Sequence, residues 1–112
     1  MTALKLTFKN DRFKKSRGGY SRLLDIYCES CGQYLFYYQK DGPGIIKRLY
    51  LDRIYQSEEY QKLENKPLKE IPQLICPSCR KLLGMPYLFQ KEKRPAFRMF
   101  VGAITKKIVK SK

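Results

Sequence analysis

Two pairs of cysteines, each with the spacing Cys-x-x-Cys, constrain the fold of this 112-residue chain more than any other feature. The segment IYCESCGQYL at 26–35 aligns with LICPSCRKLL at 74–83, and the cysteines, one serine and one leucine coincide. All four cysteines of the chain lie in these two segments. A chain of this length normally forms one domain with a modest core, so an added crosslink or bound metal would contribute much of its stability.

Tetrahedral coordination of a metal ion by four thiolates is the arrangement that this pattern favours. Zn²⁺ binds four cysteine sulfurs at about 2.3 Å, and a site closed by four protein ligands is structural rather than catalytic. Gly32 can take the positive φ that a tight turn often needs, and Pro77 fixes φ near about −65° at the start of the second turn. We therefore predict one structural Zn²⁺ per chain. Its expected ligands are Cys28, Cys31, Cys76 and Cys79.

This layout resembles a zinc ribbon of the rubredoxin-like kind, in which a β-hairpin follows each of two cysteine knuckles. The resemblance is carried by Cys28-x-x-Cys31-Gly32 and Cys76-Pro77-x-Cys79, and it covers roughly residues 24–104. It implies a small β-rich fold. The sequence departs from the pattern in two places: 44 residues separate the two pairs, and Arg80 stands where a second glycine is expected.

Other uses of the cysteines remain open. Iron in place of zinc would give an electron carrier, because rubredoxins share these motifs, although rubredoxins are typically acidic. A redox dithiol of the thioredoxin type needs one pair beside a βαβ pattern rather than two matched pairs. Two disulfides would suit a secreted protein, but the N-terminal residues MTALKLTFKNDRFKK lack the apolar stretch of a secretory signal. We therefore expect the reducing cytoplasm, where cysteines more often bind metal.

The net charge of +14 lies at the two ends of the chain. Residues 1–27 carry +5, residues 28–70 are neutral, and residues 71–112 carry +9. Such a field attracts polyanions, of which nucleic acid is the commonest. An anionic membrane surface is another candidate, whereas solubility alone would need only a few units of charge. No run of about 18 apolar residues occurs, so no membrane span is expected.

The chain contains no histidine, which removes the Ser-His-Asp and Cys-His arrangements and the usual neutral-pH general base. The best enzymatic alternative is a metal-dependent nuclease, in which Asp52 and the triplet Glu64-Asn65-Lys66 would help to hold Mg²⁺. That chemistry needs the triplet on a rigid strand beside the aspartate, whereas KLENKPLK is polar and contains a proline. We therefore expect no catalytic residues.

Most of the expected secondary structure is strand. YLFYYQK at 34–40 and IIKRLYLDRIY at 45–55 predict a hairpin around the turn signal DGPG. Tyr34, Phe36 and Tyr38 would share one side of it, and the opposite side could stack bases. SEEYQKLEN at 57–65 predicts a short helix, and MPYLFQ at 85–90 a strand. Residues 97–110 fit both a strand and an amphipathic helix, with Gly102 and the β-branched residues favouring the strand.

The charge pattern divides the expected molecule into a basic flexible arm at 1–22 and one zinc-ribbon domain at 23–112. Within the domain, an insert spans about 56–72 and a basic tail about 105–112. The expected nucleic-acid contacts lie in the arm, beside the second knuckle, after the strand at 85–90 and toward the C-terminus. They are Arg12, Lys14, Lys15, Arg17, Arg22, Arg80, Lys81, Lys91, Lys93, Arg94, Arg98, Lys106, Lys107 and Lys110.

Taken together, these features predict a non-catalytic zinc-ribbon protein that binds nucleic acid. RNA is expected rather than DNA, because no helix with base-reading residues for the major groove is visible. The chain resembles the small basic ribosomal proteins that carry two Cys-x-x-Cys pairs. This likeness implies a ribosome or another ribonucleoprotein as the setting, with other proteins of the complex as further partners. The alternative is a ribbon that docks on the transcription machinery or on another protein.

Overall fold

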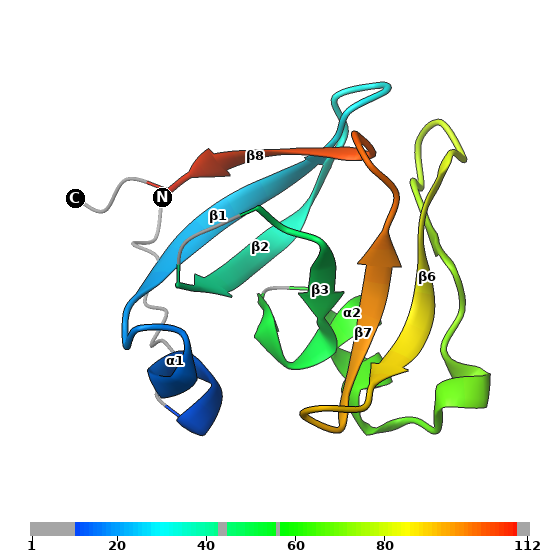
Figure 1. The fold of residues 1–112 in the computed structure, drawn as a ribbon. Coiled ribbons are helices and arrows are strands. Elements are labelled where there is room, and N and C mark those ends of the chain that lie inside the picture. The colour runs from blue at the N-terminus through cyan, green and yellow to red at the C-terminus, as the bar shows by residue number, and fades with distance from the viewer. Residues whose placement is uncertain (1–10, 43–44, 56, 110–112) are drawn as a thin grey trace.

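The computed structural model of the protein describes residues 11–42, 45–55 and 57–109, and it consists mainly of short strands (Figure 1). Three short 3₁₀ helices, at Leu51–Arg53, Lys62–Asn65 and Leu68–Glu70, connect them. The remaining elements, in chain order, are α1 (Arg12–Ser16), β1 (Ser21–Cys28), β2 (Tyr34–Asp41), β3 (Arg48–Tyr50), β4 (Ile54–Tyr55), α2 (Glu58–Gln61), β5 (Leu74–Ile75), β6 (Leu82–Phe89), β7 (Arg94–Met99) and β8 (Ile104–Ile108).

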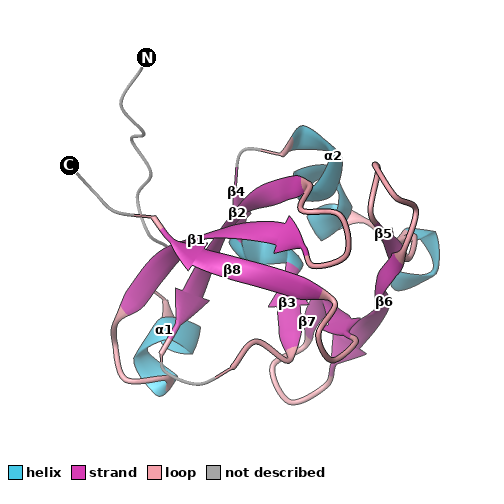
Figure 2. Cartoon of the chain, turned by 90° about the horizontal axis from the view of Figure 1, so that it is seen from above, coloured by secondary structure: helices cyan, strands magenta, loops and turns pink. Residues whose placement is uncertain are grey.

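The strands form two four-stranded antiparallel sheets. The first has the order β4-β2-β1-β8 and the second the order β3-β7-β6-β5. Figure 2 shows β1 and β8 running across β3 and β7, so that one sheet lies over the other. Each sheet has one apolar face, and packing the two faces together removes both from water.

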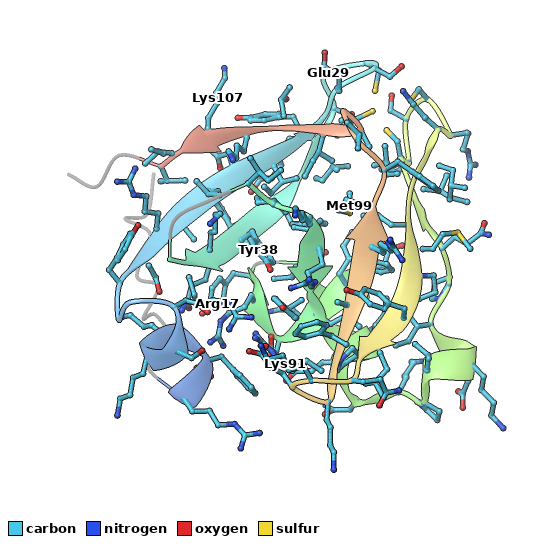
Figure 3. The ribbon with its side chains drawn as sticks, in the orientation of Figure 1. Arg17, Glu29, Tyr38, Lys91, Met99 and Lys107 are labelled. Atoms are coloured by element: carbon cyan, nitrogen blue, oxygen red, sulfur yellow. The ribbon has the colours of Figure 1, made fainter. Side chains whose placement is uncertain are left out.

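The core lies between the two sheets. Alternation along β1 buries Leu24 and Ile26, while Leu49 and Phe97 are contributed by the second sheet. The Tyr38 hydroxyl accepts a hydrogen bond of 2.9 Å from the backbone N–H of Tyr50, which links β2 of the first sheet to β3 of the second. Tyr38 accordingly lies in the space between the sheets in Figure 3. Its hydroxyl has a partner, as a buried polar group requires.

The expected hairpin between 34–40 and 45–55 forms only in part. β2 pairs with β4 through Tyr37 and Tyr38, but β3 pairs with β7 in the other sheet. The 3₁₀ turn at Leu51–Arg53 separates β3 from β4 and redirects the chain from one sheet to the other. The segment at 45–55 therefore joins the two sheets instead of forming one returning strand.

Tyr34 lies on a different side of β2 than expected. Phe36 and Tyr38 are buried, whereas the Tyr34 ring packs edge-on against Tyr27 and Tyr37, with ring centroids 5.5 and 5.6 Å away. The register between β1 and β2 shifts at Ile26/Tyr27, and a β-bulge at this position changes the side to which the neighbouring residues point.

The described part of the expected flexible arm contains the helix α1. The Asp11 carboxylate caps this helix by accepting hydrogen bonds from the N–H groups of Phe13 and Lys14, at 3.1 and 3.2 Å. The same carboxylate lies 2.7 Å from the buried guanidinium of Arg53. This ion pair holds α1 against the domain, so residues 11–22 belong to the folded structure.

The C-terminal residues also differ from the expected tail. β7 ends at Met99, a turn follows, and residues 104–108 form β8, which pairs with β1 from Leu24–Ile108 to Cys28–Ile104. The strand interpretation of 97–110 is thus confirmed, with an interruption at Gly102. The helix expected at 57–65 is present as α2 followed by a 3₁₀ turn, and the strand expected at 85–90 is β6, which begins three residues earlier.

Candidate metal centre

The first knuckle joins β1 to β2. Cys28 ends β1, and its N–H donates a 2.8 Å hydrogen bond to the carbonyl of Gln33. The N–H of Gly32 donates to the Cys28 carbonyl at 2.8 Å, and Gly32 has φ of 78°. A glycine takes this left-handed conformation without strain, which is the role predicted for it. The turn thereby directs Cys28 and Cys31 toward the same point.

The second knuckle repeats this geometry between β5 and β6. The N–H of Cys76 donates to the carbonyl of Lys81, and the N–H of Arg80 donates to that of Cys76, both at 2.9 Å. Arg80 has φ of 66°, so an arginine occupies the left-handed position that glycine fills in the first knuckle. A register shift precedes each knuckle, at Ile26/Tyr27 and at Leu74/Ile75. The repeat seen in the sequence is therefore a repeat in backbone structure.

The four predicted ligands come together where the two knuckles meet. Their sulfur atoms all lie within 4.8 Å of one another. The Sγ atoms of Cys28 and Cys79 are 3.7 Å apart, and those of Cys31 and Cys76 are 3.6 Å apart. A tetrahedral ion with metal–sulfur bonds of about 2.3 Å needs sulfurs about 3.8 Å apart. The cluster therefore has the donor set and the spacing to hold one metal ion.

Each knuckle contributes one buried and one exposed cysteine. Cys28 and Cys76 are fully buried, while Cys31 and Cys79 reach the surface, and all four are free thiols. The shortest sulfur–sulfur distances exceed the roughly 2.05 Å of a disulfide. The disulfide alternative therefore has no counterpart in this structure. Four thiolates suit soft or borderline metals such as zinc and iron.

The thiols influence one another's protonation. Burial raises the pKa of Cys76, but the N–H groups of Cys79 and Ser78 and hydrogen bonds from Cys31 and Cys79 outweigh it and lower this pKa to about 6. The N–H of Lys81 lowers the pKa of Cys79, whereas burial and the neighbouring sulfurs outweigh it and raise that pKa to about 11. Hydrogen bonds among the clustered thiols therefore favour the thiolate of Cys76 and the protonated thiol of Cys79. Metal binding requires all four to be deprotonated.

The predicted nucleic-acid contacts separate into distinct groups. Lys14 is half-buried, and Lys110 lies outside the described residues. Figure 3 shows Lys107 pointing away from the sheet. The exposed members are Arg12, Lys15, Arg22, Arg80, Lys81, Lys91, Lys93, Arg98, Lys106 and Lys107. Arg17 and Arg94 form a different group, because both lie in ion pairs within the fold.

Arg94 is buried between two aromatic rings, with its guanidinium carbon 4.0 Å from the ring centroid of Phe13 and 3.7 Å from that of Tyr50. It lies 2.7 Å from Asp52 and 2.9 Å from Glu92. Arg17 also bonds Glu92, at 2.9 Å. Burial raises the pKa of Glu92, but hydrogen bonds and charge from the two arginines outweigh this effect, so the pKa is lowered overall. These arginines hold α1 and β7 together.

The nuclease alternative requires an aspartate that can bind a metal and a triplet on a neighbouring strand. Both Asp52 oxygens accept hydrogen bonds from Arg94, at 2.7 and 3.2 Å. Glu64 lies in the 3₁₀ helix Lys62–Asn65 rather than on a strand. The described residues therefore lack the strand-borne triplet of such a site.

Sequence reasoning missed a second buried ion-pair cluster around Arg53. This side chain is 1% exposed and bonds Asp11 at 2.7 Å and Asp41 at 2.9 Å. Its partners come from positions 11 and 41, and no local spacing marks them as neighbours.

Comparison of the chain with models of protein families, with curated proteins and with solved structures finds no match. The features that define the molecule are its β-rich fold and its cluster of four cysteines. Among the described residues, no helix has the length and apolar character needed to cross a membrane.

Proposed function

We propose that the protein is a zinc-ribbon protein that binds RNA without catalysing its chemistry, as a component of the ribosome or of another ribonucleoprotein in the cytoplasm. The observation that supports this proposal best is the way in which folding pairs acidic groups with arginines of the fold. A protein whose carboxylates are engaged internally presents its excess cations to a polyanion.

Four of the ten acidic residues lie in the two ion-pair clusters, where they face only three of the 24 basic residues. Outside the clusters and the insert at 56–72, the described residues include 14 basic side chains against only two acidic ones, Asp25 and Glu29. The other four acidic residues, at positions 58, 59, 64 and 70, belong to the insert. The acidic residues are thus concentrated in the clusters and the insert, and the rest of the described chain has an excess of cations that can neutralise several phosphates.

Zinc is the proposed metal because four thiolates in a tetrahedral arrangement form a closed structural site. In this role the ion would fix the two knuckles against each other and so connect the first sheet to the second. The ion carries two positive charges against four thiolates, and the exposed cations Arg80 and Lys81 would partly offset the remaining negative charge. The RNA-binding surface would then lie on a scaffold that the metal stabilises.

The test is the affinity for a labelled single-stranded RNA, measured by fluorescence anisotropy over a series of salt concentrations. Arg12→Gln with Lys15→Gln, and Lys106→Gln with Lys107→Gln, should each weaken binding. Log K falls as log salt rises, and each lost phosphate contact should make this decrease shallower by about 0.7 in slope. The matched control is Lys62→Gln, Lys66→Gln and Lys69→Gln in the acidic insert, which should have much less effect.

The second candidate function is docking on another protein, such as the transcription machinery. It would leave RNA affinity weak at physiological salt and insensitive to these charges. Absence of RNA binding by the intact zinc-loaded protein, or equal losses from the two ends and from the insert, would contradict the RNA proposal.

A further inference from the structure

A groove of about 820 Å³ lies where the chain passes from β7 in the second sheet to β8 in the first. Its lining includes residues 45–47, which precede β3, and Arg48 at the start of that strand. The turn 100–103, the first residues of β8 and side chains from β6 and β7 complete it. Figure 1 shows β7 leading directly into β8 at this crossing, and Figure 3 places Met99 there. The volume falls within the range of about 300–1,000 Å³ that is usual for ligand sites.

The turn beside the groove is held firmly. The N–H of Ala103 donates to the Phe100 carbonyl at 3.2 Å, and Gly102 has φ of 74°, as the third position of a type II turn requires. The N–H of Phe100 donates to Leu83 of β6, and the N–H of Glu29 donates to Ala103, both at 3.1 Å. The last bond joins the turn to the first cysteine knuckle. The metal centre and the groove therefore share one framework.

Apolar side chains in the groove are left uncovered. Phe100 is 48% exposed and Ile45 is 74% exposed, and Val101 at the tip of the turn is fully exposed. Large exposed apolar side chains gathered around one hollow are uncommon on a monomeric protein and mark a binding surface. The Phe100 ring is large enough to stack on a nucleic-acid base.

The charged side chains that line the groove are all cationic. They are Lys47, Arg48, Arg98 and Lys106, and no carboxylate occurs among the described lining residues. Arg48 has a fixed position, because it donates to the hydroxyls of Tyr50 and Tyr87 and lies 4.0 Å over the Phe89 ring. The other three are exposed. An apolar and aromatic surface bordered by cations combines base stacking with phosphate neutralisation.

We propose that this groove holds a short single-stranded segment of RNA, with a base stacked on Phe100 and phosphates bound by Lys47, Arg98 and Lys106. This inference rests on the proposed function and specifies the part of the RNA that the protein recognises. A duplex keeps its bases paired and stacked, so it cannot place one against Phe100. An acidic peptide could also form ion pairs with these cations. The experiment must therefore distinguish a bound peptide from bound RNA.

The experiment uses the zinc-loaded full chain and two RNA probes, an unpaired ten-nucleotide RNA and the same sequence annealed to its complement. Phe100→Ala should lower affinity for the unpaired probe about tenfold, in keeping with the loss of one stacked base, and should change affinity for the duplex little. Leu68→Ala, at an apolar side chain with similar exposure outside the groove, is the matched control. The double variant Lys47→Gln with Arg98→Gln should likewise lose more affinity for the unpaired probe than the control double variant Lys62→Gln with Lys66→Gln.

Zinc content and thermal unfolding of each variant verify that the fold is intact, and Ile45→Ala replaces Phe100→Ala if the latter does not fold. Crosslinking of a 4-thiouridine probe should map to peptides that contain the turn 100–103. Equal affinities of Phe100→Ala and Leu68→Ala for the unpaired RNA would overturn the inference while leaving the proposed RNA binding intact. Binding of an acidic peptide that is lost in Phe100→Ala but does not displace the RNA would likewise overturn the inference and leave the proposed RNA binding intact. A wild-type protein that binds neither probe would instead overturn the proposed function.

Discussion

Gly32 and Arg80 occupy the same position in the two cysteine knuckles, and both have a left-handed backbone, with φ of 78° and 66°. In each knuckle the N–H of this residue donates to the carbonyl of the first cysteine, at 2.8 and 2.9 Å. Glycine adopts this conformation freely, whereas a residue with a Cβ is strained by roughly 1–2 kcal/mol. The second knuckle therefore has a strained arginine at the position where the first knuckle has an unstrained glycine.

Arg80→Gly should raise the free energy of unfolding by about 1 kcal/mol, because the relief of strain exceeds the entropy that glycine adds to the unfolded chain. Arg80→Ala is the matched control, since it removes the side chain but keeps the strain. Chemical denaturation of the zinc-loaded protein measures both. If the glycine variant is no more stable than the alanine variant, the backbone strain is not significant. Weaker RNA binding by both variants would show that the guanidinium contacts phosphate.

Removal of the metal should unfold the protein. Structural zinc contributes on the order of 10–16 kcal/mol in small zinc domains, which equals or exceeds the usual stability of a domain. Elemental analysis should find one zinc per chain, and a strong chelator should abolish the cooperative unfolding transition. Cys79→Ser should act as the chelator does, whereas Ser78→Ala, one residue away, should retain the metal. A metal-free protein that unfolds cooperatively would contradict the prediction, and iron in the elemental analysis would reassign the site.

Gly42 lies against the backbone that follows α1, and it has φ of 72°. A Cβ at this position would collide with the Arg17 carbonyl and would lie 2.8 Å from the Arg17 Cβ. Gly42→Ala should therefore cost roughly 3 kcal/mol and disturb the ion pair between Arg17 and Glu92. Gly19→Ala isolates the contribution of φ, because Gly19 has φ of 78° and nothing within 4 Å of its Cβ position; it should cost about 1 kcal/mol. Thermal unfolding that shifts equally in the two variants would refute the steric argument.

Asp11 should make the stability depend on pH in acid. Burial raises the pKa of its carboxyl, but the hydrogen bond and charge of Arg53 and the N–H groups of Lys14 and Phe13 outweigh it and lower the pKa from 3.8 to about 2. A carboxylate with a lowered pKa in the folded state stabilises the fold above its unfolded pKa, and this contribution is lost as the pH falls from about 4 to 2. Stability should therefore fall more steeply over this range in the wild type than in Asp11→Asn.

Acid also protonates the cysteines and releases a bound metal, so the comparison depends on the difference between variants that share the same four thiols. Glu64→Gln, at an exposed carboxylate of the insert, is the control and should follow the wild-type curve. Parallel curves for Asp11→Asn and the wild type would show that the Asp11–Arg53 ion pair adds no pH dependence.

Several features of the fold and the site followed from local sequence alone. The spacing of the cysteines specified all four members of the sulfur cluster, and the repeat at 26–35 and 74–83 predicted two knuckles of equal geometry. The positive φ of Gly32 and the helix within 57–65 were also predicted. These features depend on residues a few positions apart, whose conformations are limited by the backbone itself.

Contacts between distant residues decided the rest. The chain at 45–55 divides between two sheets because Tyr50 binds Tyr38 on one side and β3 pairs with β7 on the other. Residues 104–108 were expected to form a strand, but their pairing with the edge of β1 was not, because no pattern within those residues reveals which strand they join. Arg94 and Arg98 look alike in the sequence, yet the first is buried between Phe13 and Tyr50 and the second lines the groove. Net charge is a property of the sequence. Which cations remain free to meet a polyanion depends on which carboxylates the tertiary structure brings to each guanidinium, since burial and pairing are properties of three-dimensional neighbours.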